Sequence, residues 1–132
     1  MTAYDVVKWI HLLAVATWTG GLIVLAIVVA ALRRQTDDVE VLRAAARAFG
    51  YASWTAMAVA MAAGVWLYLD WGLAWSEFLL KGTILAATLG LTIYHQITAR
   101  NTSPMVRGII QAAILVLSII LFYAAVILVP GR

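Results

Sequence analysis

Two ionisable side chains, His11 and Lys81, lie inside long apolar stretches of this sequence. An imidazole can ligate a metal ion or a haem iron or move a proton, and a lysine ammonium can neutralise an anionic group or, once deprotonated, donate a nitrogen ligand. Ionisable groups inside hydrocarbon are costly, and they usually mark a functional site. His11 and Lys81 are therefore the first candidates for a site.

Four apolar segments make up nearly all of the chain, in which 65% of the 132 residues are hydrophobic and 11% are charged. A helix needs about 20 apolar residues to cross a hydrocarbon core about 30 Å thick. The expected spans are residues 6–32, 48–69, 78–98 and 106–129. We predict an all-α fold, an integral membrane four-helix bundle that forms a single domain over residues 1–132. Its main partner is then the lipid bilayer, and we expect a multi-pass protein of the cell inner (plasma) membrane.

Composition also excludes several kinds of site. Cysteine is absent, which excludes disulfides, thiolate metal sites and iron–sulfur clusters. The formal net charge of +3 is too small to indicate a nucleic-acid partner. The first apolar run is too long for a cleaved signal sequence, so we expect it to remain as a span.

The distribution of cations predicts the orientation in the membrane. Six arginines flank the first and third connections: Arg33, Arg34, Arg43, Arg47, Arg100 and Arg107. The opposite side holds only three cations: Lys8, Lys81 and Arg132. Because cytoplasmic connections carry the excess of Lys and Arg, both termini are predicted to face outward.

Capping residues predict where the helices begin and end. Asp37, followed three residues later by Glu40, resembles a capping box for the second helix. Ser76 is the expected N-cap of the third helix, and Ser103-Pro104 suits the start of the fourth. The expected helix ends are Asp70-Trp71-Gly72 and Pro130-Gly131.

Helical rise places several polar or amphipathic side chains at one depth. At about 1.5 Å per residue, His11, Lys81, Trp66 and Tyr123 all fall in one layer of the outer leaflet. His95 lies near the inner end of the third helix and should be well over ~10 Å from His11. The two histidines are therefore not expected to share a ligand.

Each candidate also has a structural alternative. His11 could instead be an interfacial histidine bonded to a backbone carbonyl or water, and Lys81 could extend its ammonium to the headgroups. His95 resembles an ordinary polar helix end. Trp18, seven residues after His11 and near the bilayer centre, either lines a flat cofactor pocket or packs against a groove of small residues.

Small residues at helical spacing predict close helix contact. One stripe lies on the second helix and one on the third: Ala52, Ala56, Ala60, Gly64, Gly82, Ala86 and Gly90. Met57 and Met61 are one turn apart and could form a thioether site for Cu(I), although packing is the simpler interpretation.

Several short segments resemble a known membrane family. Trp9-Ile10-His11-Leu12-Leu13 and Trp18-Thr19-Gly20-Gly21-Leu22 resemble the first helix of the copper-resistance D (CopD) membrane domain. Phe78-Leu79-Leu80-Lys81 resembles its lysine-bearing helix, and residues 47–64 are similar to the helix before it. The same pair, His11 and Lys81, also resembles the related HemJ family, four-helix membrane proteins that oxidise protoporphyrinogen IX and bind haem b. The resemblance covers nearly the whole chain.

Three functional hypotheses follow from the residues and the resemblance. The first is a haem b protein, in which His11 is an axial ligand, Lys81 neutralises a propionate or ligates, and Trp18 and Tyr123 wall the pocket. As an enzyme it would be a haem-dependent membrane oxidoreductase, similar to protoporphyrinogen oxidase. The second is a copper-handling membrane protein with His11 as the metal ligand. The third is an accessory subunit without a cofactor, held in a homo-oligomer or a larger membrane complex.

Overall fold

The chain is all-α in the computed structural model, which describes residues 1–72 and 74–128. Its four helices are α1 (Ala3–Gln35), α2 (Val39–Trp71), α3 (Trp75–Thr98) and α4 (Pro104–Leu128). All four are long and apolar enough to cross a membrane, consistent with a helical bundle in a multi-pass membrane protein. The predicted fold class is thus confirmed. The expected end at Pro130-Gly131 lies outside the described residues.

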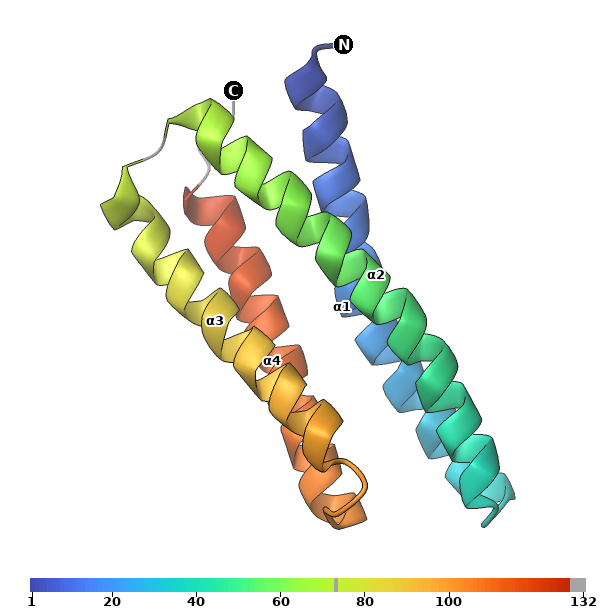
Figure 1. Cartoon of the computed structure of the whole chain (residues 1–132). Coiled ribbons are helices and arrows are strands. Elements are labelled where there is room, and N and C mark those ends of the chain that lie inside the picture. The colour runs from blue at the N-terminus through green and yellow to red at the C-terminus, as the bar shows by residue number, and fades with distance from the viewer. Residues whose placement is uncertain (73, 129–132) are drawn as a thin grey trace. The chain divides into compact units, whose positions relative to one another are not determined.

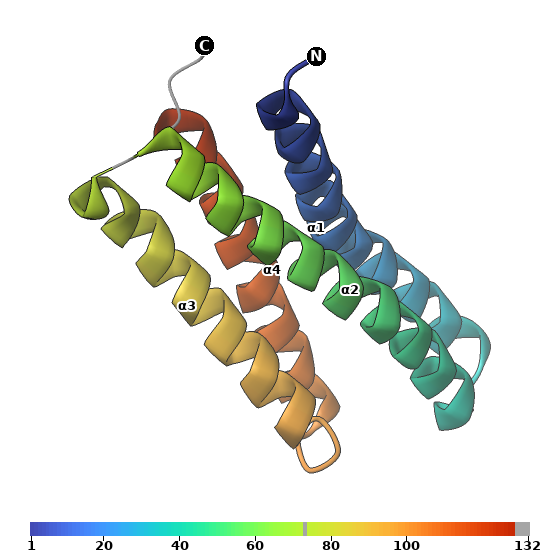
Figure 2. The same ribbon diagram turned by 45° about the horizontal axis from the view of Figure 1, so that its top comes forward.

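The helices form two compact units, each an antiparallel pair (Figures 1 and 2). Unit 1 contains α1 and α2, which are joined by a short connection, and unit 2 contains α3 and α4. The single domain expected from the sequence stays a prediction.

Side-chain caps define three of the helix starts, at α1, α2 and α4. At α1, Thr2 Oγ1 accepts a hydrogen bond from the Asp5 backbone N–H at 3.2 Å, and the Asp5 carboxylate accepts one from the Thr2 N–H at 2.8 Å. This reciprocal capping box satisfies two donors that the first turn leaves unpaired. At α4, Ser103 Oγ accepts from the Val106 N–H at 3.3 Å, and Pro104 is the first helical residue, which confirms the predicted start.

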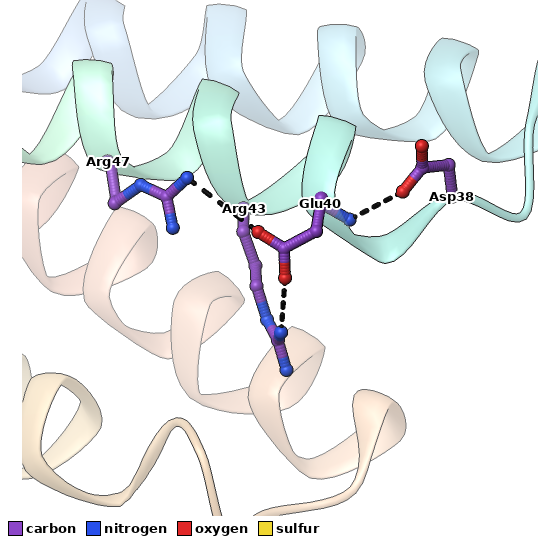
Figure 3. A network of polar contacts seen from close by, with 4 residues as sticks. All are labelled: Asp38, Glu40, Arg43 and Arg47. Atoms are coloured by element: carbon purple, nitrogen blue, oxygen red, sulfur yellow. Dashed lines mark hydrogen bonds and ion pairs between the residues drawn. The ribbon is translucent and has the colours of Figure 1, made fainter.

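The predicted start of α2 was wrong by one residue. The N-cap is Asp38 rather than Asp37, and its carboxylate accepts from the Glu40 N–H at 2.9 Å (Figure 3). Glu40 does not return to the cap, because its carboxylate pairs with Arg43 and lies 3.9 Å from Arg47. These ion pairs are exposed, so they contribute little stability.

The predicted cap of α3 was also wrong. The helix begins at Trp75, so Ser76 lies inside its first turn. Trp75 stacks on Phe78 with ring centroids 5.7 Å apart, an aromatic contact that holds this turn together. The predicted break before α3 is confirmed, because α2 ends at Gly72 in the left-handed conformation (φ 65°), which favours glycine.

Unit 1 buries a tryptophan on α1 and mostly small side chains on α2. The buried residues of α1 are Ala14 and Trp18. Those of α2 are Ser53, Ala56, Met57, Ala60 and Ala63. The small-residue stripe predicted on α2 therefore lies in the helix interface at positions 56 and 60. Met57 belongs to the same packed face, as the packing interpretation of its thioether predicts.

Unit 2 packs instead around hydroxyl-bearing residues. Thr88 is 1% exposed, and Thr92, Ile114 and Ser118 are also buried. Each hydroxyl donates to the carbonyl one turn earlier, at 2.8 Å for Thr88, 2.7 Å for Thr92 and 2.8 Å for Ser118. These bonds satisfy polar groups that are costly in an apolar interior.

The small-residue stripe predicted on α3 does not form its packed face. Ala86 and Gly90 are exposed. Thr88 and Thr92, each two residues further along, are buried. Two residues correspond to about 200° around a helix, so the stripe lies on the opposite face.

Enlarging Thr88 should disrupt the interior of unit 2. We expect Thr88→Leu to lower the free energy of unfolding by about 1–3 kcal/mol, because the site has no room for added volume. Thr83→Leu is the matched control, since Thr83 lies on the same helix, bonds Leu79 in the same way and is exposed. Equilibrium unfolding in detergent measures both. Equal stability of the two variants would contradict this account of the packing.

Candidate functional site

The four site residues expected from the sequence lie in both units. In unit 1, His11 is half-buried on α1 and Trp18, on the same helix, is 5% exposed. In unit 2, Lys81 is half-buried on α3, and Tyr123 is 67% exposed on α4. Because the units are described separately, the structure leaves the joint role of His11 and Lys81 as a prediction.

His11 bonds the backbone of the neighbouring helix. Its Nδ1 lies 2.8 Å from the carbonyl oxygen of Ala60, on α2. A carbonyl oxygen only accepts hydrogen bonds, so Nδ1 carries the proton and donates it. The imidazole is therefore held in one orientation by a backbone atom that cannot move independently of the helix.

Gly64 makes room for the His11 ring. A Cβ atom at position 64 would lie 3.0 Å from Cε1 of His11 and 3.4 Å from its Nδ1. Helical side chains lean over the preceding turn, so a side chain at position 64 would also cover the Ala60 carbonyl, four residues earlier. Glycine at this position leaves both the ring site and the acceptor open.

The bond to Ala60 determines which nitrogen can act chemically. In the neutral ring, a proton on Nδ1 places the basic lone pair on Nε2. Histidines that ligate metals or haem commonly donate their other ring N–H to a carbonyl or carboxylate, which orients the ring and makes it a better ligand. A bond to a backbone carbonyl was also expected if His11 is an interfacial histidine without a ligand. The contact therefore shows which nitrogen donates, and it fits both a ligand and an interfacial histidine.

These features suit a histidine that would hold a haem. Haem iron takes a neutral imidazole, and the Nδ1–H of such a histidine needs an acceptor, here Ala60. A copper ion fits less well, because stable sites want several imidazole or sulfur donors. Across residues 1–72 and 74–128 no three His, Cys, Asp or Glu side chains gather into a possible metal site.

Trp18 is a buried residue of α1, with 5% of its surface exposed. Unit 1 does have an open apolar groove between α1 and α2, lined in part by Ala14, Ala52 and Ala56. Neither His11 nor Trp18 is among the residues that line this groove. The pocket wall expected from Trp18 stays a prediction.

The sequence interpretation missed the partners of His11. It placed Ala60 and Gly64 in a packing stripe and did not connect them with the histidine. The available signal was depth: Gly64 lies two residues before Trp66, which had been placed at the level of His11. Depth alone does not show which face of α2 is turned toward α1.

Filling the space at Gly64 should displace the imidazole. We expect Gly64→Val to break the bond between His11 and Ala60, because even its Cβ approaches the ring to 3.0 Å. Gly50→Val is the matched control, since Gly50 is on the same helix and a Cβ there meets nothing within 4 Å. Imidazole ¹⁵N spectra report the tautomer, and His95→Gln assigns the two histidine signals. An unchanged His11 signal in Gly64→Val would show that the bond does not hold the ring.

Searches of family models, curated proteins and solved structures find no match to this chain. Kinship with the CopD and HemJ families is accordingly a proposal that depends on the short segments around His11 and Lys81.

Proposed function

We propose that this chain is a CopD/HemJ-like multi-pass protein of the inner (plasma) membrane, with both termini outside, that binds haem b in the outer leaflet through His11. The observation that carries the proposal is the 2.8 Å bond from His11 Nδ1 to the Ala60 carbonyl. It supports a ligand role because it orients the ring and, when the ring is neutral, places the basic lone pair on Nε2.

The chemistry proposed is electron transfer. Haem b supplies one-electron oxidation and reduction when it is bound. The protein's part is to hold the imidazole and to exclude water. The space that Gly64 leaves for the His11 ring supports the first task, and the apolar helices support the second. If the donor is a porphyrinogen or a quinol, the protein is a haem-dependent membrane oxidoreductase, similar to protoporphyrinogen oxidase.

Copper handling is the weaker alternative. It would need donors beside His11, and the described residues hold no cluster of three possible metal ligands. Met57 is 7% exposed and packed within unit 1, where its thioether contributes to the helix interface.

A role as an accessory subunit without a cofactor has one observation in its favour. Ala86 and Gly90 on α3 are small, exposed and one turn apart, a pattern that suits close contact with another membrane helix. The partner would be a second copy of the chain or a larger membrane complex. This role predicts co-purification with that partner at a fixed stoichiometry.

Removing His11 tests the haem proposal. We expect the protein, purified gently from its membrane, to give a b-type Soret band and pyridine haemochrome at about one haem per chain, with His11→Ala abolishing the band. His95→Ala is the control for loss of an imidazole elsewhere and should keep it. A Soret band that survives in His11→Ala would rule out the assigned ligand. A colourless protein with a stoichiometric partner would favour the accessory role.

Two substitutions separate the roles proposed for Lys81. If its charge neutralises a haem propionate, Lys81→Arg should retain most of the haem and Lys81→Met should lose roughly tenfold or more in haem affinity. If its nitrogen ligates iron, both variants should shift the oxidised spectrum, because neither arginine nor methionine supplies an amine. Haem titration followed by absorption measures both effects. Unchanged affinity and spectra in both variants would contradict any role of Lys81 in haem binding.

A further inference from the structure

The end of unit 1 where α1 connects to α2 carries four exposed arginines. Arg33 and Arg34 lie in the last turn of α1, and Arg43 and Arg47 lie in the first turns of α2. The side chains of Arg43 and Arg47 are 59% and 62% exposed. A ligand from outside the chain can therefore reach their guanidinium groups.

Two contacts show which residues of α1 and α2 lie at the same level. His11 Nδ1 lies 2.8 Å from the carbonyl oxygen of Ala60, and a Cβ atom at Gly21 would meet the ring of Phe49. About the same number of residues separates the two contacts on each helix. The antiparallel register is therefore regular along this part of the pair.

This register places the charged start of α2 beside an apolar part of α1. Continued toward the connection, it brings Arg47 about level with Val24 and Arg43 about level with Val28. The large apolar residues that α1 exposes at this level are Ile23, Val24, Ile27 and Val28. Such a face is stable against lipid chains rather than against water. Lipid chains should therefore reach about as far as Val28, where α2 already carries arginine.

The lengths of the apolar runs lead to the same depth. At about 1.5 Å per residue, residues 6–32 of α1 extend about 40 Å and residues 48–69 of α2 about 33 Å. A hydrocarbon core is about 30 Å thick, so only the run of α2 matches it. The excess of α1 lies beside Arg43 and Arg47, which places these two arginines at the boundary between hydrocarbon and headgroups.

The side chains at this end lean toward one level. A helical Cα–Cβ bond tilts toward the helix N-terminus, which for α2 is at the connection. Arg47 follows this direction, because its guanidinium lies 3.9 Å from the carboxylate of Glu40, seven residues nearer the connection (Figure 3). Arg33 and Arg34 end α1, so their Cα–Cβ bonds tilt the opposite way, back toward the membrane. The four side chains are thus directed toward the same layer.

The carboxylates of this end leave donors on the arginines. Asp37 and Asp38 lie at the connection, and Asp38 caps α2. Among the side chains that the structure describes, Glu40 alone forms ion pairs with these arginines, and it is shared by Arg43 and Arg47. A guanidinium has five N–H donors, so one carboxylate does not satisfy two of them. Exposed ion pairs are also weak, so an outside anion can compete for both groups.

We propose that the α1–α2 end of unit 1 binds anionic phospholipids, with Arg43 and Arg47 as donors to the lipid phosphate. Guanidinium groups recognise phosphate through parallel N–H donors, and every further cation near an anionic membrane surface adds affinity, here Arg33 and Arg34. The apolar face of α1 argues for a lipid over a free phosphate ion, because it keeps this level in contact with acyl chains. The proposal needs unit 1 to cross a membrane and does not depend on haem.

The test titrates lipids into the delipidated full chain in an uncharged detergent. The probes are phosphatidylglycerol, phosphatidylcholine as the zwitterionic lipid with the same phosphate, and glycerol 3-phosphate as the anion without acyl chains. Native mass spectrometry counts bound lipid, and the ¹⁵N–¹H signals of the Arg43 and Arg47 Nε–H groups report contact on the unmodified protein. We expect phosphatidylglycerol to bind and to shift both signals, phosphatidylcholine to bind roughly fivefold more weakly, and glycerol 3-phosphate at equal concentration to shift neither.

Variants test the assigned donors. Arg43→Gln and Arg47→Gln should each weaken phosphatidylglycerol binding roughly fivefold, the usual contribution of one arginine near an anionic surface. Glu40→Gln should strengthen it roughly twofold, because the variant frees both guanidinium groups from their ion pairs. Arg100→Gln is the matched control, since it removes the same charge from an exposed position in unit 2 and should change binding less than about twofold.

Several outcomes would overturn the proposal. Equal losses in Arg47→Gln and Arg100→Gln would mean general charge attraction, and no gain in Glu40→Gln would mean that these guanidinium groups are not the donors. Equal affinity for the two lipids, or equal shifts with glycerol 3-phosphate, would remove the selectivity for an anionic lipid. A dimer that excludes lipid would assign the surface to a second copy of the chain. Arg43 and Arg47 signals that bound phosphatidylglycerol does not move would place the lipid elsewhere, whatever the folding of any variant.

Discussion

Polar groups inside hydrocarbon must find their partners within the protein, and this requirement shapes the whole chain. The four helices satisfy most of their backbone groups internally. The same rule explains the buried hydroxyls of unit 2, since Thr88 and Thr92 each donate to a carbonyl of the preceding turn. His11 follows it too, by donating to Ala60. Three buried side-chain atoms among the described residues depart from the rule: Thr19 Oγ1, His95 Nδ1 and Arg107 Nε.

Small side chains decide where such partners can be reached. In unit 1, alanines on α2 let α1 approach, and Gly64 leaves the Ala60 carbonyl accessible to the imidazole. In unit 2, the interface uses Thr88, Thr92 and Ser118 instead. The two helix pairs thus bury different side chains: one buries a large aromatic residue, Trp18, and mostly small residues, and the other buries hydroxyl groups that donate to their own helix.

Local signals predicted helix boundaries with mixed success. Gly72 and Ser103 were identified because a left-handed C-cap and a Ser-Pro start leave clear marks in a sequence. The start of α2 was misplaced because Asp37 and Asp38 are adjacent and chemically identical, and the sequence alone does not show which carboxylate accepts from the first turn. Ser76 was misassigned because the stacking of Trp75 on Phe78 extends the helix by a residue.

The length and apolar character of continuous sequence segments were enough to determine that this chain has four long apolar helices. Both properties belong to residues that are neighbours in the sequence, so no distant contact has to be known. They also predict the depth of His11, since helical rise is constant. Only the tertiary structure decided what His11 bonds and which face of α3 is buried. Both depend on how each helix is rotated about its axis, and that rotation is set by side chains from another part of the chain packing against it.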